Sequence, residues 1–211
     1  MSVPVPPNEK KRLKILWQYD VLDTVPEEIF DDLTELAARI CEAPIALISL
    51  VDEDRQWFKS TVGIAVRETS RDISFCAHAL LHQGLFIITD ATKDPRFANN
   101  PLVSSAPGIR FYAGAPLITP DGHALGTLCV IDHLPRQLRP EQQQALLVLS
   151  RLVMTQLELR RHSRELAATQ KAHGETTQEL EAARAELARL KSKPTAPKPH
   201  ARKALKTARR R

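Results

Sequence analysis

Residues 110–132, RFYAGAPLITPDGHALGTLCVID, contain two apolar runs on either side of Thr119-Pro120-Asp121-Gly122. Pro fits the second position of a type I turn, Asp the third, and Gly the left-handed position that follows. The stretch therefore predicts a β-hairpin with a short bulged loop. Neither face of its strands is polar, so we expect a hairpin inside a sheet that is covered on both sides.

Three residues of this hairpin carry more specific expectations. Gly114 and Gly126 would let other atoms approach the backbone closely. Pro116 has no N–H to donate to a strand ladder, which predicts a bulge or a missing partner at that position.

The flanking sequence alternates between helical and strand patterns. Helices are expected over residues 8–19, 29–41 and 72–81, and a long one starts near residue 141. Near-continuous apolar runs predict strands over residues 44–52, 56–63 and 85–89, and residues 90–108 form a long loop. The chain is therefore expected to contain both helices and strands.

Composition favours one globular domain with extensions. An apolar fraction of 43% is enough for a core within 211 residues. Three cysteines without metal-site spacing predict neither a disulfide framework nor a metal site, and a reducing cytoplasm is the simplest compartment. The N-terminal residues show no signal-peptide pattern, and no membrane span is predicted.

Positive charge is concentrated at the C-terminus. Residues 189–211 hold ten of the 30 Lys and Arg and no acidic residue, which leaves 20 basic against 25 acidic residues in the remainder. A disordered tail is expected over residues 191–211. It would either solubilise the chain or tether it, without sequence preference, to nucleic acid or another anionic surface. The cations of the candidate nucleic-acid tail are Lys198, Arg202, Lys203, Lys206, Arg209, Arg210 and Arg211.

The long C-terminal helix carries a leucine at every seventh position with one gap. His173 occupies the gap, and the companion positions are mostly polar. A dimeric coiled coil over residues 160–190 and a single solvated helix are both compatible with this half-apolar repeat. The residues of the predicted dimer helix are Leu152, Leu159, Leu166, Leu180 and Leu187.

Residues that could carry catalysis do not form a recognisable set. There is no glycine-rich phosphate loop, no HExxH and no GxSxG pattern. Cys76 and His78 are two residues apart on one expected helix and point to different sides. Each cysteine fits a small buried hydrophobe, and His78 fits either a pocket donor or a core histidine. We therefore expect no enzyme, and in particular no cysteine-based reductase.

Several stretches, taken in order, carry a family resemblance. They are YDVLDTVPEEIFDDLTELAARICEAPIALISLVDEDRQWFKS, DISFCAHAL, ITDATKDPRFANNPLV, the hairpin quoted above, and PRQL. From residue 8 to residue 159 the chain resembles the GAF domain family, in the branch found N-terminal to bacterial sensor histidine kinases and diguanylate cyclases. Residues 1–7 would then be a flexible arm.

The resemblance implies an α+β fold, in which a central antiparallel sheet of five or six strands has helices on both faces and a long C-terminal helix follows. The first and last helices would pack on one face and dimerise. The other face would hold a small-molecule pocket beneath the DISFCAHAL helix and the long loop. The pocket candidates that this implies are Trp57, Phe75, Cys76, His78, Asp90, Phe97, Tyr112 and Cys129. Resemblance implies the fold and leaves the ligand open.

Departures from family patterns limit the expected cofactors and partners. Cys76 is followed by Ala77 and not by the His of bilin-binding relatives, and the NKxxxFxxxDE pattern of cyclic-nucleotide binders is absent. No covalent bilin or haem is predicted, and the cofactor stays unknown. The expected role is a sensory module that forms a homodimer and acts on a separate kinase or cyclase output protein.

Overall fold

The computed structural model describes residues 3–192 of the 211-residue chain. Its elements in chain order are α1 (Glu9–Gln18), α2 (Glu28–Cys41), β1 (Ile45–Val51), β2 (Arg55–Val62), β3 (Glu68–Ser70), η1 (Arg71–Ile73), α3 (Phe75–Ala79), β4 (Phe86–Ile88), α4 (Pro101–Ser104), β5 (Phe111–Ile118), β6 (Ala124–Asp132) and α5 (Pro140–Ser192).

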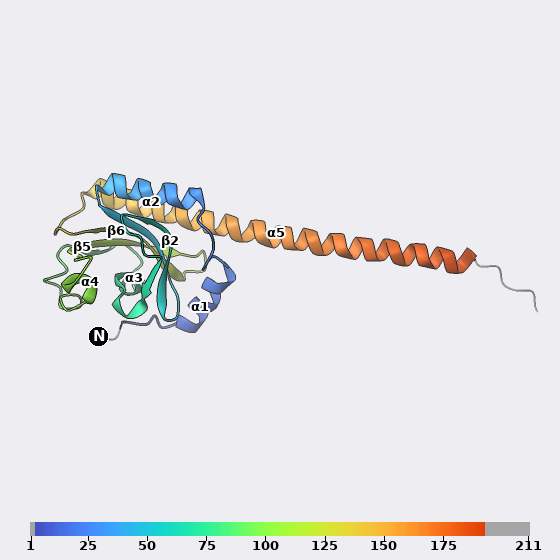
Figure 1. Ribbon diagram of the computed structural model, residues 1–211, viewed down its shortest axis with the longest axis horizontal. Coiled ribbons are helices and arrows are strands. Elements are labelled where there is room, and N and C mark those ends of the chain that lie inside the picture. The colour runs from blue at the N-terminus through green and yellow to red at the C-terminus, as the bar shows by residue number, and fades with distance from the viewer. Residues whose placement is uncertain (1–2, 193–211) are drawn as a thin grey trace, which may run out of the picture. The chain divides into compact units, whose positions relative to one another are not determined.

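Within the described residues, six strands form one antiparallel sheet in the order β3-β2-β1-β6-β5-β4. The predicted α+β fold class with a central antiparallel sheet is thus confirmed. The hairpin that the sequence predicts is β5–β6, and β6 also pairs with β1 in the middle of the sheet (Figure 1).

Both faces of the sheet are covered, as the apolar strands predict. Figure 1 shows α2 and the first part of α5 on one face and α3 and α4 on the other. We call the two layers the helix-side cluster and the cavity-side cluster. The helix-side cluster includes Leu50, Trp57, Leu117, Leu128, Leu149 and Val153. The cavity-side cluster includes Phe58, Phe75, Cys76, Phe97, Tyr112 and Cys129.

The hairpin turn has the chemistry that its sequence predicts. The Gly122 N–H donates to the Thr119 carbonyl at 2.9 Å, and Gly122 has a φ of +83°. Pro116 pairs with Thr127 on β6, but the β4 ladder ends at Gly114. Pro116 therefore lies where the partner strand is missing on one side, and its lack of an N–H leaves no ladder bond broken.

Local structure differs from the expected elements in two places. The helix predicted over residues 72–81 is the short helix α3, preceded by η1, because the Ser74 side chain and not Asp72 caps it by accepting from the Ala77 N–H. The short edge strand β3 was not predicted, because three residues are too few to show alternation.

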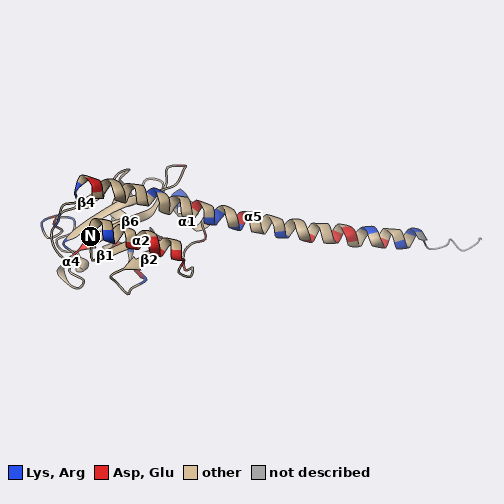
Figure 2. Cartoon of the chain, turned by 90° about the horizontal axis from the view of Figure 1, so that it is seen from above, with Lys and Arg blue, Asp and Glu red and all other residues tan. Residues whose placement is uncertain are grey.

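The residues of helix α5 are divided between two compact units. The first unit ends at Arg164, and the second begins at Glu165 and is helical to Ser192. The heptad leucines are exposed in the single chain, with exposed fractions of 44% at Leu152 and 54% at Leu187. Lys, Arg, Asp and Glu are interspersed along the helix (Figure 2). Dimerisation through these leucines stays a prediction.

The tail cations from Lys198 to Arg211 lie outside the described residues. Among residues 3–192, no helix combines the length and apolar character needed to cross a membrane.

Candidate functional site

Aromatic rings from three segments stack on the cavity side of the sheet. The Phe75 ring, on α3, lies 4.1 Å from the Phe97 ring and 5.3 Å from the Tyr112 ring, measured between centroids. The His78 ring meets the edge of Phe97 at 4.7 Å. The structure thus brings together residues of α3, β5 and the loop before α4.

Glycine makes room for this stack on β5. A Cβ at Gly114 would lie 2.3 Å from the Tyr112 hydroxyl oxygen, so any larger residue would displace the buried ring. The glycine that the sequence marked as a point of close approach therefore admits an aromatic side chain of its own strand.

Sulfur and hydroxyl groups lie beneath α3. The Cys76 Sγ is 3.9 Å from the Cys129 Sγ, and the Tyr112 hydroxyl is 3.4 Å from the Thr127 hydroxyl. All four side chains are buried. Six of the eight predicted pocket residues consequently occupy one cluster: Phe75, Cys76, His78, Phe97, Tyr112 and Cys129.

A cavity of about 490 Å³ opens beside this cluster, and we call it the α3 cavity. The Arg96 guanidinium lines it and donates to both oxygens of Asp94, at 2.9 and 2.6 Å, while lying over the Phe97 ring. Burial and the nearby Arg96 charge lower the pKa of His78, which favours a neutral imidazole at the cavity wall. The lining residues are Val3, Asp72, Ile73, His78, Arg96, Asn99, Asn100 and Pro101.

Two predicted pocket residues lie elsewhere. Trp57 is buried in the helix-side cluster, across the sheet from the α3 cavity. Asp90 accepts from Thr92 and pairs with Lys93 at 3.1 Å, in a separate surface depression that Arg136 also lines. Ligand contact by these two residues stays a prediction, and the structure does not bring them to the other six.

A buried lysine that the sequence did not single out joins the sheet to α5. The β1–β2 register shifts between Ile48 and Ser49, which leaves Lys59 as the extra residue of a β-bulge. The Lys59 ammonium donates to the Thr24 hydroxyl at 2.9 Å, the Val25 carbonyl at 2.8 Å and the Glu27 carboxylate at 2.6 Å.

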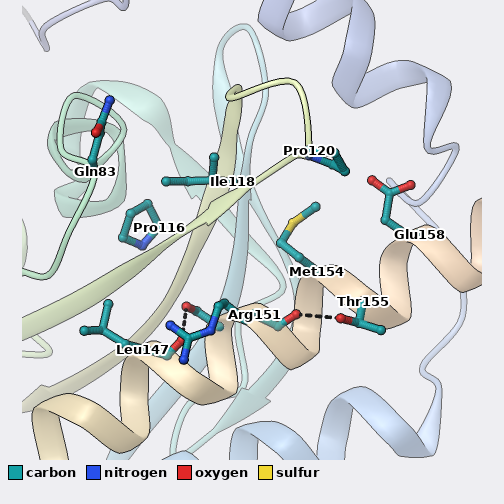
Figure 3. A pocket seen from close by; sticks show the side chains of 10 residues that line it. Gln83, Pro116, Ile118, Pro120, Leu147, Arg151, Met154, Thr155 and Glu158 are labelled. Atoms are coloured by element: carbon teal, nitrogen blue, oxygen red, sulfur yellow. Dashed lines mark hydrogen bonds between the residues drawn. The ribbon is translucent and has the colours of Figure 1, made fainter.

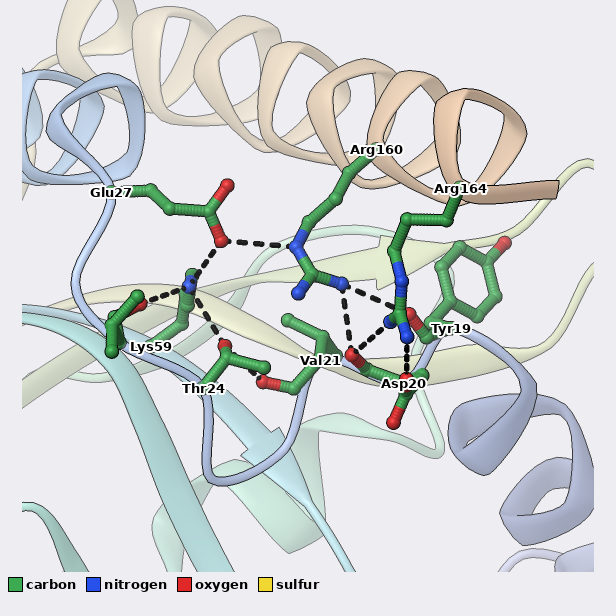
Figure 4. Close-up of polar contacts among 9 residues, drawn as sticks. Tyr19, Asp20, Val21, Thr24, Glu27, Lys59, Arg160 and Arg164 are labelled. Atoms are coloured by element: carbon green, nitrogen blue, oxygen red, sulfur yellow. Dashed lines mark hydrogen bonds and ion pairs between the residues drawn. The ribbon is translucent and has the colours of Figure 1, made fainter. Parts of the chain in front are cut away.

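The same carboxylate binds α5. The Arg160 Nε donates to Glu27 Oε1 at 2.9 Å, and its Nη1 donates to the Asp20 carbonyl at 2.9 Å (Figure 4). Arg164 adds a hydrogen bond of 2.8 Å to that carbonyl and an ion pair with the Asp20 carboxylate. We call Lys59, Glu27 and Arg160 the α5 clamp.

The clamp sets the ionisation of its carboxylate. Burial raises the pKa of Glu27, but the hydrogen bonds from Lys59 and then Arg160 outweigh it and hold the pKa below its usual value. A lysine within a strand is normally interpreted as solvent-exposed, so the sequence offers no signal for the buried contact between Lys59 and Glu27.

A second hollow, of about 400 Å³, lies on the helix side between the end of β5 and α5. Figure 3 shows Pro116 and Ile118 facing Leu147, Met154 and Glu158 across it. None of the eight predicted pocket residues lines it. Within the described part of the chain, no three His, Cys, Asp or Glu side chains are grouped as metal ligands.

A six-stranded antiparallel sheet with helices on both faces and a cavity beside α3 together make an α+β domain. The chain belongs to the GAF domain family, whose model matches residues 25–157. The family resemblance is thereby confirmed.

One relative from Pseudomonas aeruginosa is named cyclic di-GMP phosphodiesterase PA2567 and is 45% identical over 155 residues, covering 73% of this chain. The match covers 26% of that protein, so the chain spans about a quarter of its length.

Solved structures agree on the fold. The GAF domain of a phosphoenolpyruvate-protein phosphotransferase from Coxiella burnetii is 18% identical, with a TM-score of 0.52 over 76% of this chain and 99% of that one. The corresponding domain from Acinetobacter is 16% identical, with a TM-score of 0.52 over 73% of this chain and 95% of that one.

The expectation of no enzyme is wrong, because the 45% identical relative carries the name of an enzyme. That expectation rested on the absence of a nucleophile–base pair and of known catalytic motifs within these 211 residues. A search for motifs in these 211 residues says nothing about the rest of the named phosphodiesterase, of which this chain matches only a part.

Proposed function

We propose that the chain is a sensory module of cyclic di-GMP signalling, in which a small molecule in the α3 cavity controls a phosphodiesterase activity. The observation that carries this proposal is the 45% identity, over 155 residues, to the named phosphodiesterase. This replaces the kinase or cyclase output suggested by the family branch alone.

The α3 cavity supports a small polar ligand. Its volume of about 490 Å³ lies in the range of metabolite-binding sites. Asp72 and Arg96 supply both signs of charge, and Asn99 supplies donor and acceptor groups. A zwitterionic or polar metabolite would satisfy these groups better than an apolar one.

The α5 clamp supplies a route from the cavity side to the helix. Phe58 belongs to the cavity-side cluster, and the next residue, Lys59, reaches Glu27 on the other face. Glu27 in turn holds Arg160 of α5. A change in cavity-side packing would therefore reach α5 through two consecutive residues of β2.

We further propose that α5 pairs with a second copy of the chain through its exposed leucines. An apolar stripe along a solvated helix is the pattern that a partner helix covers. In such a dimer, a displacement of α5 would change how the two α5 helices pair, and this change could control the phosphodiesterase activity.

Native mass spectrometry of the purified chain tests the ligand. A retained small molecule is expected, and Arg96→Met should lose it while Lys93→Met, at an exposed position outside the cavity, should keep it. Equal retention by both variants would exclude the α3 cavity as its site.

A chimera tests the control of phosphodiesterase activity. This chain would replace the matching stretch of the Pseudomonas aeruginosa relative, and the rate of cyclic di-GMP hydrolysis would be measured, with the chain alone assayed in parallel. Arg160→Met should change the rate. Arg139→Met, which removes exposed ion pairs with Glu42 and Glu141, should not. Equal rates in both variants would contradict the clamp as a route.

A further inference from the structure

Cys76 and Cys129 form a close pair of thiols that the proposed function does not use. They come from α3 and β6, 53 residues apart in sequence. Their sulfur atoms are 3.9 Å apart and are joined by a hydrogen bond. Both side chains are buried, with exposed fractions of 2% and 0%. The fold therefore holds two distant thiols in direct contact.

The surroundings of the pair favour one thiolate. Burial raises the pKa of Cys76, but hydrogen bonds from Cys129 and then from Thr127, Tyr112 and Ser49 outweigh it and lower that pKa. Burial and the neighbouring Cys76 raise the pKa of Cys129. The first proton to leave the pair thus leaves a sulfur that is stabilised by four donors.

We propose that Cys76 and Cys129 are a modification site, at which hydrogen peroxide oxidises the two thiols to a disulfide that fastens α3 to β6. The proposal goes beyond ligand sensing, because it gives the module a second, redox input.

The reaction balances in two steps. The Cys76 thiolate attacks one peroxide oxygen, the O–O bond breaks, and the departing hydroxide takes up the thiol proton as water, leaving a sulfenic acid. The Cys129 sulfur then attacks the Cys76 sulfur, the S–O bond breaks, and hydroxide leaves with the Cys129 proton as a second water. Two thiols lose two electrons and two protons, and one peroxide becomes two waters.

The geometry requires only a small movement. A disulfide bond is about 2.05 Å long, so sulfurs now 3.9 Å apart must approach by about 1.9 Å. In the proposed disulfide, the short helix α3 would move toward the central strand β6. Because α3 also places His78 at the α3 cavity, oxidation would change the cavity wall.

Cys41 provides an internal control. It is buried in the helix-side cluster, on the other face of the sheet from the pair. Burial raises the pKa of Cys41 to about 11, so it is mostly a neutral thiol near pH 7. It should stay reduced under conditions that oxidise the pair.

Peptide mapping of the full chain tests the proposal. The protein is treated with hydrogen peroxide, its remaining thiols are alkylated in denaturant, and proteolytic fragments are weighed. We expect a fragment that joins the Cys76 and Cys129 peptides and is lighter by two hydrogen atoms, Cys41 alkylated, and loss of the link on reduction with dithiothreitol. Cys41→Ser should keep the link, and Cys76→Ser should abolish it.

Three results would overturn the proposal. These are alkylation of all three cysteines after peroxide treatment, sulfinic or sulfonic acid at Cys76 without a link, and a link that involves Cys41 or joins two chains. Because the wild-type map alone distinguishes these results, the test survives if Cys76→Ser fails to fold, and Cys129→Ala is the alternative variant.

Discussion

Lys59 shows how a single residue can be both costly and necessary. Its side chain is fully buried, and such a charge is tolerated only because three oxygens surround the ammonium group. Without Lys59, the Glu27 carboxylate would keep Arg160 but lose its shorter ion pair.

Lys59→Met should therefore lower the free energy of unfolding by about 2 to 3 kcal/mol, the usual cost of removing one partner from a buried charged hydrogen bond. Urea denaturation followed by circular dichroism measures this. Lys93→Met, which removes an exposed ammonium, should leave the midpoint unchanged. Equal midpoints for wild type and Lys59→Met would contradict a structural role for the clamp.

Glu27 should make stability depend on acidity. Its folded pKa lies below the ordinary value of 4.5, so its contribution is complete above that value and is lost as the pH falls through the folded pKa. The thermal midpoint of Glu27→Gln should consequently fall less steeply than that of wild type below pH 4.5. Glu35→Gln, at an exposed ion pair with Arg39, should follow the wild-type curve. Parallel curves for all three proteins would refute this assignment.

The sequence located the aromatic stack but not the clamp. Phe75, Phe97 and Tyr112 lie in stretches that resemble the family, and the fold brings them together. Trp57 belonged to the same prediction, yet strand alternation places it on the helix side. Lys59 was missed because a bulge depends on pairing between strands, which a single strand's sequence does not display.

Among the elements, the β5–β6 hairpin is the one that the sequence predicted most fully. Turn chemistry fixed its loop, and apolar character on both strand faces placed it inside the sheet. The start of α3 was less predictable, because Ser74 and Asp72 are both good capping residues and tertiary packing decides between them.

The hairpin's contact with β1 leads to a prediction. A Cβ at Gly126 would lie 1.9 Å from the Ser49 carbonyl oxygen, and backbone atoms cannot move aside easily. Gly126→Ala should therefore cost about 3 kcal/mol in denaturant unfolding, near the upper end for overpacking. Gly84→Ala, where a Cβ meets nothing within 4 Å, should unfold like wild type. If Gly126→Ala were as stable as wild type, the backbones of β1 and β6 would have to lie farther apart at Gly126 than the structure places them.

Helix α5 carries the prediction about assembly. If a second copy covers the leucine stripe, Leu180→Ser together with Leu187→Ser should convert a dimer into a monomer, as measured by size-exclusion chromatography with light scattering. Leu134→Ser, at an exposed leucine outside α5, should not change the measured mass. If the wild-type chain is a monomer at tens of micromolar, the proposal of a dimer is wrong.

For the molecule as a whole, charge is divided between a mildly acidic body and a basic end. Deleting residues 191–211 should abolish retention of DNA at low salt, because nine of the chain's 30 Lys and Arg lie in that segment. A variant of full length with Gln in place of the tail's Lys and Arg separates charge from length. If wild type is not retained by DNA at low salt, the tail does not act as a tether.

The sheet that the two clusters cover also limits how this chain can evolve. Every residue of β1 is buried, and so is every residue of β5 except Ile118. A strand with no solvent-facing position has no neutral site at which a polar substitution could be absorbed. Substitutions should therefore accumulate on the helix surfaces and in the loops around the α3 cavity. Related chains could then come to bind different ligands while the sheet stays nearly unchanged.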